Sequence, residues 1–220
     1  TTPEAALKER EKTREIVIKA PAFEYLLTEI IGTAPYVSNK FSSEALAMMR
    51  AKQEKGHQGK KGGARKPKDF EANYKETMHT SKEGWHGIPA TSFRNAMISA
   101  CRLIGFKMTL AKMAVFVEGE GLDAHEGTPL VRILDGEPRK HEGFVRLATG
   151  VADIKAAAMW ETWRCKLRIR YDSDIFSSDD VANLLMRAGQ QVGVGRGRPD
   201  STASAGMGWG TFRIMENANG

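Results

Sequence analysis

The 220-residue sequence has only two cysteines, and none of its apolar runs approaches the roughly 20 residues needed to span a membrane. Cys101 and Cys165 both lie in apolar patterns, which favours buried free thiols over a disulfide. Residues 4–15 are charged and therefore do not have the pattern of a secretory signal. We expect a cytoplasmic protein with no membrane partner.

The sequence also has no recognisable spacing for a metal or a nucleotide cofactor. Its five histidines are scattered and do not have metal-ligand spacing. The glycine-rich run at 189–200 follows a predicted helix, whereas a dinucleotide-binding fingerprint precedes one, and no G-K-[ST] ending is present. We expect no metal and no cofactor.

The positive charge is concentrated in one short segment. The net charge is +6, and residues 50–68 contain eight basic residues and one acid, so the rest of the chain sums to −1. Glycines and the scarcity of apolar residues predict a mobile basic insertion over 50–84 within a single domain of residues 1–220. A mobile polycation favours binding of a polyanion, with a solubilising linker as the alternative. The candidate nucleic-acid contacts here are Lys60, Lys61, Arg65 and Lys66.

Hydrophobic periodicity predicts strands and helices on both sides of this insertion. Strands are expected over 15–19, 23–31, 113–117, 130–134, 144–148, 163–171 and 210–214, and helices over 43–55, 91–105 and 177–189. Ser177 with Asp180 fits a capping box at the start of the last helix.

The helix that begins at Thr91 or Ser92 has an apolar face typical of a core helix. Ser92, Arg94 and Asn95 lie in its first turn, where free N–H groups and the helix dipole favour an anion. A solvated helix face explains the same residues equally well.

Apolar and basic residues alternate along the strand at 163–171, so one face carries Arg164, Lys166, Arg168 and Arg170. Either acids of the protein or a bound phosphate backbone must neutralise these like charges. The acids that follow suit a helix N-terminus better than a metal site. A metal-dependent nuclease that uses Asp172, Asp174, Asp179 and Asp180 is the enzymatic alternative.

The glycine-rich run is followed by a second G-x-G-x-G pattern at 206–210. Such backbone permits close approach of a flat or anionic ligand, and Arg196 and Arg198 supply charge. Trp209 suits base stacking and core burial equally. The loop at 32–41 adds two candidate contacts, Asn39 and Lys40, and two aromatics suited to stacking, Tyr36 and Phe41.

Two motifs resemble the RAMP superfamily, which includes the backbone subunits of CRISPR effector complexes. Residues 87–96, Gly-Ile-Pro-Ala-Thr-Ser-Phe-Arg-Asn-Ala, are similar to its G-x-P-x-S-S-h-[KR]-x-A helix start, where h is apolar. Residues 191–198 with 206–210 resemble its terminal glycine-rich loop and following strand. The resemblance implies an α+β fold: a ferredoxin-like, RNA-recognition-type antiparallel sheet with helices on one face and a large mobile insertion.

The resemblance further implies an RNA-lined ribonucleoprotein filament that serves antiviral defence. Guide-type or other single-stranded RNA is then the ligand, and the partners are further copies of the chain along the RNA and other effector-complex subunits. Some relatives cleave RNA with a loop aspartate, but residues 32–68 contain no Asp. We expect a non-enzymatic RNA-binding subunit, with a nuclease or a structural protein with a basic partner-binding loop as alternatives.

Overall fold

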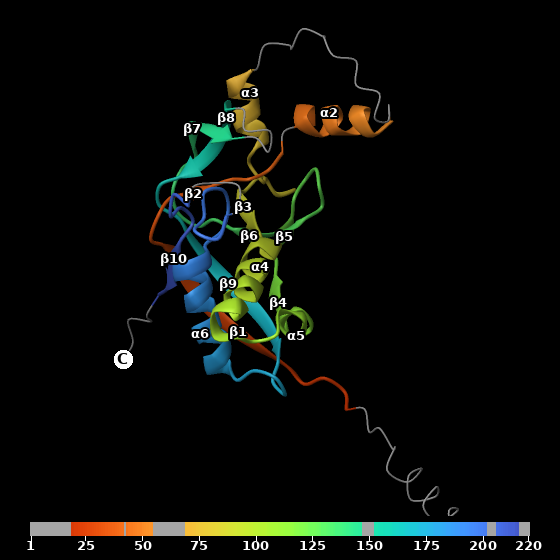
Figure 1. Ribbon diagram of the computed structural model, residues 1–220, viewed down its shortest axis with the longest axis vertical. Coiled ribbons are helices and arrows are strands. Elements are labelled where there is room, and N and C mark those ends of the chain that lie inside the picture. Colours follow the sequence, from red (N-terminus) through yellow and green to blue (C-terminus); the bar gives the residue numbers. More distant parts are fainter. Residues whose placement is uncertain (1–18, 42, 55–68, 147–151, 202–205, 216–220) are drawn as a thin grey trace, which may run out of the picture.

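The structure is a computed structural model that describes residues 19–41, 43–54, 69–146, 152–201 and 206–215. Its main sheet has four strands, in the spatial order β10-β1-β9-β4, and all neighbours are antiparallel. The strands are β1 (Phe23–Gly32), β4 (Val115–Glu118), β9 (Arg164–Asp172) and β10 (Phe212–Ile214). β1 and β9 form the centre and are paired along nearly their whole length (Figure 1).

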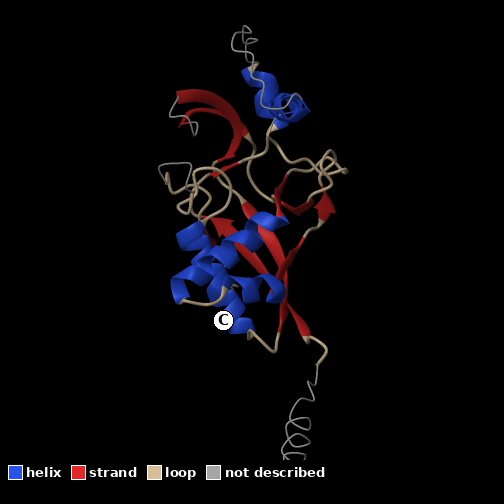
Figure 2. Ribbon diagram, turned by 45° about the vertical axis from the view of Figure 1, so that its right-hand side comes forward, coloured by secondary structure: helices blue, strands red, loops and turns tan. Residues whose placement is uncertain are grey.

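Two helices pack together on one face of this sheet, α4 (Ala90–Ala100) and α6 (Ser178–Arg187) (Figure 2). Phe93 and Met97 of α4 and Leu184 of α6 are buried against Ile30 and Ile169 of the sheet. The core elements follow each other along the chain as β1, α4, β4, β9, α6 and β10. The protein is therefore an α+β fold built on an antiparallel sheet.

The start of α6 has the geometry that its sequence predicts. The Ser177 hydroxyl accepts from the backbone N–H of Asp180, 3.1 Å away, and the Asp180 carboxylate accepts from the Ser177 N–H at 3.0 Å. The capping box is thus confirmed. α6 continues as a π-helical turn (Ala188–Val192) and ends at Gly193.

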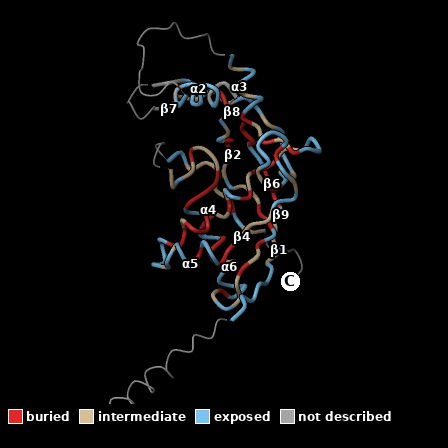
Figure 3. The backbone as a smooth tube through the Cα atoms, turned by 90° about the vertical axis from the view of Figure 1, so that its right-hand side faces the viewer, coloured by how far each residue is buried: buried red, intermediate tan, exposed pale blue. Residues whose placement is uncertain are grey.

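Two smaller three-stranded sheets lie beyond the Gly32 end of β1. One has the order β2-β8-β7, and the other has the order β3-β6-β5. The first consists of β2 (Tyr36–Val37), β8 (Ala152–Trp160) and β7 (Arg139–Arg146), and the second of β3 (Gly87–Pro89), β6 (Pro129–Arg132) and β5 (Gly121–Leu122). Together with α2 (Ser43–Glu54) and α3 (Phe70–Glu76), β7 and β8 form the upper part of the molecule (Figure 1). Burial is concentrated in the core around α4 and β9, whereas α2 is exposed (Figure 3).

Within the insertion predicted over 50–84, the structure describes 50–54 and 69–84. The latter part contains α3, which packs on β8: the Ala158 N–H donates to the Thr77 hydroxyl at 2.9 Å. The Tyr74 hydroxyl donates to the carbonyl of Pro138 at 2.8 Å. This half of the insertion is therefore joined to the fold by defined contacts, while its basic part at 55–68 lies outside the described residues.

The middle of the chain differs most from the sequence prediction. The strand expected over 113–117 begins only at Val115, because α5 (Met108–Ala114) occupies the preceding residues after a 3-10 turn (Cys101–Ile104). Of the strand expected over 144–148, residues 144–146 are the end of a longer strand, β7, and residues 147 and 148 lie outside the described residues. Its partner β8 was not predicted as a separate strand. Residues 15–18 of the first expected strand lie outside the described residues. None of the described helices combines the length and apolar character that membrane crossing requires.

Candidate nucleic-acid interface

The two glycine-rich segments, residues 189–200 (the first arm) and 206–210 (the second arm), are hydrogen-bonded to each other and to β2. The Val194 N–H donates to the carbonyl of Gly210 at 2.9 Å, and the Gly210 N–H donates to Pro35 at 2.7 Å. The Arg196 N–H donates to the carbonyl of Val37 at 2.9 Å. The arms therefore hold a defined position beside the loop that follows β1.

Glycine is required where the first arm crosses β2. Gly195 has a φ of +76°, and a Cβ there would collide with the carbonyl oxygen of Val37 and the ring of Tyr36. The close approach leaves Tyr36 fully enclosed, and burial raises the pKa of its phenol. Tyr36 is thus a core residue and does not reach the surface.

Trp209 packs mainly inward. It lies against the small cluster of Val37, Ala157 and Met159, and its ring meets the His141 ring edge to face at 5.0 Å. Its backbone N–H donates to the carbonyl of Gly197 at 3.2 Å. The contacts of Trp209 hold the glycine arms on β2 and β8, with only part of its surface left to solvent.

Arg196 is the distinctive charge of this region. It is half-buried, burial lowers the pKa of its guanidinium, and no acidic partner occurs among the described residues. Burial together with the charges of Arg196 and Arg139 lowers the pKa of His141 on the adjacent strand. Arg198 donates to the carbonyl of Gly195 at 3.2 Å and is also half-buried. Two half-buried cations, two residues apart in sequence, thus belong to a loop whose backbone is hydrogen-bonded to β2.

The four residues after β2 alternate between inside and outside. The Ser38 hydroxyl donates to the carbonyl of Thr77, and the Lys40 ammonium lies 3.0 Å from the carboxylate of Asp123. Asn39 and Phe41 are exposed, Phe41 with 50% of its surface accessible to solvent. Asn39 is therefore placed as an outer contact, whereas Lys40 is engaged in the interior and is not available to a ligand in this arrangement.

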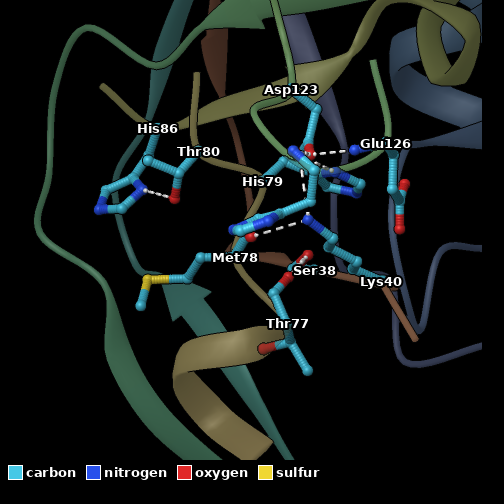
Figure 4. Close-up of polar contacts among 10 residues, drawn as sticks. Ser38, Lys40, Thr77, Met78, His79, Thr80, His86, Asp123 and Glu126 are labelled. Carbon is cyan, nitrogen blue, oxygen red and sulfur yellow. Dashed lines mark hydrogen bonds and ion pairs between the residues drawn. The ribbon is translucent and has the colours of Figure 1, made fainter. Parts of the chain in front are cut away.

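Asp123 is the centre of this interior contact (Figure 4). Its carboxylate is fully buried and accepts from the N–H groups of His125 and Glu126, each at 2.9 Å, and lies 3.1 Å from His79 Nδ1. Burial alone would raise the pKa of Asp123, but these donors and Lys40 outweigh it and lower the pKa. The cluster ties the loop after β2 and the segment after α3 to the β5–β6 turn.

Arg94, in the first turn of α4, is directed toward the edge strand β4. Arg94 Nε donates to the carbonyl of Val115 at 2.9 Å, its Nη2 donates to Lys112, and its guanidinium lies 4.9 Å from the Phe116 ring. Arg94 thus caps the edge strand β4. Ser92 is half-buried and Asn95 is exposed.

The basic face of β9 is largely neutralised by acids of the protein. Arg164 pairs with Glu29 at 2.5 Å and with Asp135 at 2.7 Å. Arg168 and Arg170 share Glu118, at 3.0 and 3.7 Å. Lys166 has no ion-pair partner among the described residues. The sequence left two ways to neutralise these charges, acids of the protein or a bound phosphate backbone. Acids of the protein account for the three arginines.

Lys60, Lys61, Arg65 and Lys66 lie outside the described residues, so the structure places none of them. Sequence reasoning overlooked Asp123 and His79, although an Asp four residues before Gly127 is typical of a turn that such a carboxylate caps. Within the described residues, no group of three or more His, Cys, Asp or Glu side chains is arranged to hold a metal ion. No protein-family model matches the chain, and no curated protein matches it in sequence.

Proposed function

We propose that this chain binds single-stranded RNA without cleaving it and acts as a repeating subunit along the RNA strand. The observation that carries the proposal is Arg196, a half-buried guanidinium with no acidic partner among the described residues. Withdrawing a cation from water without a counter-charge is unfavourable, and a bound phosphate compensates for it. Arg198 on the same loop supplies a second positive charge.

We further propose that the core is ferredoxin-like. The succession β1, α4, β4, β9, α6, β10 and the spatial order β10-β1-β9-β4 support this assignment, since the ferredoxin-like unit is a β-α-β-β-α-β repeat. RNA-recognition domains use a four-stranded sheet of this kind. The resemblance to RAMP-type subunits is part of the same proposal, with a guide-type RNA in a CRISPR-type complex as its context.

In the proposed complex, the RNA backbone follows the glycine arms and the bases face the loop after β2. Arg196 and Arg198 contact phosphates, and Asn39 hydrogen-bonds to a base or a sugar. Phe41 provides the stacking surface, because Tyr36 is buried and Trp209 packs against β8. Phosphate contacts and stacking do not depend on base identity, so we expect binding to be sequence-tolerant.

The test compares two charge reversals with the same change in net charge. Arg196→Glu removes the proposed phosphate contact. Lys112→Glu is the control. Lys112 is an exposed residue of α5, and α5 precedes the end of β4 that pairs with Tyr171. Affinity for a fluorescent oligouridine is measured by anisotropy over a series of salt concentrations. We expect Arg196→Glu to bind at least about tenfold more weakly with a shallower salt slope, and Lys112→Glu to match the wild type.

Equal affinities of the two variants, or binding that is insensitive to salt, would overturn the proposal. The same samples are incubated with Mg²⁺ and the RNA is examined on a denaturing gel, where the proposal expects intact RNA. Degradation that disappears in an Asp172→Ala, Asp174→Ala variant would instead favour the nuclease alternative.

A further inference from the structure

The main sheet leaves one edge of β1 open along much of that strand. β9 pairs with β1 over residues 23–31, whereas β10 pairs with it only over residues 30–32. No described strand lies beside residues 23–28 on the side of β10, and β1 continues well past β10 there (Figure 1). Tyr25 and Leu27 are accordingly 48% and 72% exposed. We call this stretch of residues 23–28 the open edge.

The register shows which backbone groups face the open edge. In an antiparallel ladder, the backbone groups of successive residues alternate between the two neighbouring strands. The Gly32 N–H donates to the carbonyl of Trp163 on the β9 side, and the Met215 N–H donates to the carbonyl of Glu29 on the β10 side, both at 2.8 Å. Even-numbered residues of β1 therefore bond to β9. The N–H and C=O groups of the odd-numbered residues before Glu29 face outward and have no partner in a described strand.

The open edge lacks the features that usually prevent strand pairing. Proteins protect exposed edges with prolines, lysines, bulges or a covering element. Residues 23–28 contain no proline and no lysine, and their pairing with β9 runs without a bulge. Their one charged residue, Glu24, accepts from the hydroxyl of Tyr171 at 2.9 Å. An accessible row of backbone donors and acceptors of this kind is a template for β-strand addition.

The open edge selects an extended peptide over a nucleic acid. Its free carbonyls need N–H donors at the spacing of a strand, and a phosphate backbone offers only acceptors. The aromatic rings of the edge are also engaged by arginines. The Arg168 guanidinium lies 4.4 Å from the Tyr25 ring, and that of Arg170 lies 4.4 Å from the Phe23 ring. Stacking of bases would compete with these contacts.

A hollow of about 570 Å³ adjoins the open edge, and Leu27 belongs to both. Lys166 also lines the hollow, is exposed, and has no ion-pair partner among the described residues. The three carboxylates that line it are held by other groups of the protein: Glu29 by Arg164, Glu118 by Arg168 and Arg170, and Glu120 by the N–H of Arg132. Lys166 is thus the cation that the hollow leaves for an acidic side chain of a partner.

We propose that the open edge binds an extended segment of a partner protein by antiparallel β-strand addition. An acidic side chain of this segment passes over Leu27 and meets Lys166 in the hollow. Apolar side chains on its other face lie beside Leu26, which packs against the core. The corresponding face of β1 itself carries uncharged residues at 23, 25 and 27, so β1 of a second copy does not supply the acid. The partner is therefore a different sequence, in which acidic and apolar residues alternate.

The probe is a fluorescein-labelled peptide of about six residues that alternates glutamate and valine. When its glutamates lie opposite Tyr25 and Leu27 in an antiparallel pair, the glutamate N–H groups face β1 and the valine N–H groups face away. Methylation of the glutamate nitrogens removes these donors, whereas methylation of the valine nitrogens keeps them. We expect the glutamate-methylated peptide to bind the wild type at least about tenfold more weakly by anisotropy. Equal affinities of the two methylated peptides would overturn the proposal.

Two variants test the same contact from the side of the protein. Leu27→Pro removes one edge N–H and keeps the pairing with β9, because this N–H faces away from β9. We expect it to bind the unmethylated peptide at least about tenfold more weakly than Leu27→Ala, which keeps the N–H. The methylated peptides probe the same bonds on the wild type, so the test does not depend on the folding of Leu27→Pro.

A charge exchange tests the role of Lys166. Lys166→Glu should weaken binding of the glutamate peptide and strengthen binding of a peptide that alternates lysine and valine. Lys112→Glu is the matched control, since α5 precedes β4 at the opposite edge of the sheet, and it should change neither affinity. Equal responses of the two variants would overturn the contact with Lys166.

Other occupants of the open edge would give different results, each of which overturns the proposal. Dimers of the wild type that Leu27→Pro abolishes, without peptide binding, would assign the edge to a second copy. Peptide binding only after removal of residues 216–220 would assign it to that segment. Oligouridine binding that Leu27→Pro weakens as much as peptide binding would assign it to RNA. Arg196→Glu should bind the peptide as the wild type does, which keeps this test separate from that of RNA binding.

Discussion

The ammonium of Lys40 lies 3.0 Å from the carboxylate of Asp123, and both side chains are buried. The pair joins segments 83 residues apart in the sequence. Because it fixes residue 40 inward, Asn39 and Phe41 on either side of it are left exposed. A structural ion pair thus positions the proposed RNA-binding residues without contacting RNA.

Removing the cation of this pair should destabilise the protein. Lys40→Met leaves Asp123 buried with its remaining donors, and we expect a loss of about 3 kcal/mol in the free energy of unfolding. Asn39→Ala, the neighbouring exposed change, should alter it by less than about 0.5 kcal/mol. Urea denaturation measures both. Equal stabilities of the two variants would mean that the ion pair does not hold the loop.

Acidification should destabilise the protein in two steps. Asp123 has a lowered pKa in the fold, so its contribution is complete above the unfolded pKa of about 3.9 and is lost as the pH falls below that value. His79 has a pKa lowered chiefly by burial, so its contribution is lost as the pH falls below about 6.5. Melting temperatures between pH 8 and pH 3 test this. His79→Gln should remove the upper step and keep the lower one.

Two glycines of the second arm provide a matched pair of substitutions. Gly208 and Gly210 have φ values of +74° and +67°, but only at Gly210 would a Cβ collide with the carbonyl of Val194. Gly208→Ala should therefore cost about 1 to 2 kcal/mol from backbone strain alone. Gly210→Ala should cost more and also weaken RNA binding, because it displaces the arm that carries Arg196. Similar RNA affinities of the two variants would argue against a rigid glycine loop.

Aromatic substitutions should separate stacking from packing. Phe41→Ala should lower RNA affinity by about 1 to 3 kcal/mol and leave the melting temperature nearly unchanged, since the side chain is half exposed. Trp209→Ala should lower the melting temperature, because it removes a ring packed on Val37 and Met159. A Phe41→Ala variant that binds RNA normally would exclude this residue as the stacking platform.

The elements that the sequence predicted well are those with strong local patterns. The alternation from Trp163 to Tyr171 and the capping box at Ser177 depend only on neighbouring residues, and both appear at the expected positions. β8 was harder to predict because Ala156–Ala158 have small side chains that are all buried. The strand contacts α3 and β7, and these three residues show no alternation of polar and apolar side chains.

The interior position of Lys40 could not be predicted from local sequence. A lysine in a loop beside an aromatic and an amide is typical of a ligand-binding surface, and its partner Asp123 is distant in the chain. The same limit applies to the arginines of β9, which are Arg164, Arg168 and Arg170. Their ion-pair partners, Glu29, Asp135 and Glu118, come from three separate segments of the chain. Charge patterns located the cations, but tertiary contacts determine which of them remain free.

The pairing of Ile30 with Ile214 has a consequence for how the protein folds. The central strand β1 leaves the ribosome well before both of its partners, β9 and β10, are synthesised. Contacts of such large sequence separation slow folding and leave the early strand uncovered during translation. The apolar residues of β1 are then available to other chains, so production of soluble protein is expected to depend on the rate of synthesis and on chaperones that shield this strand.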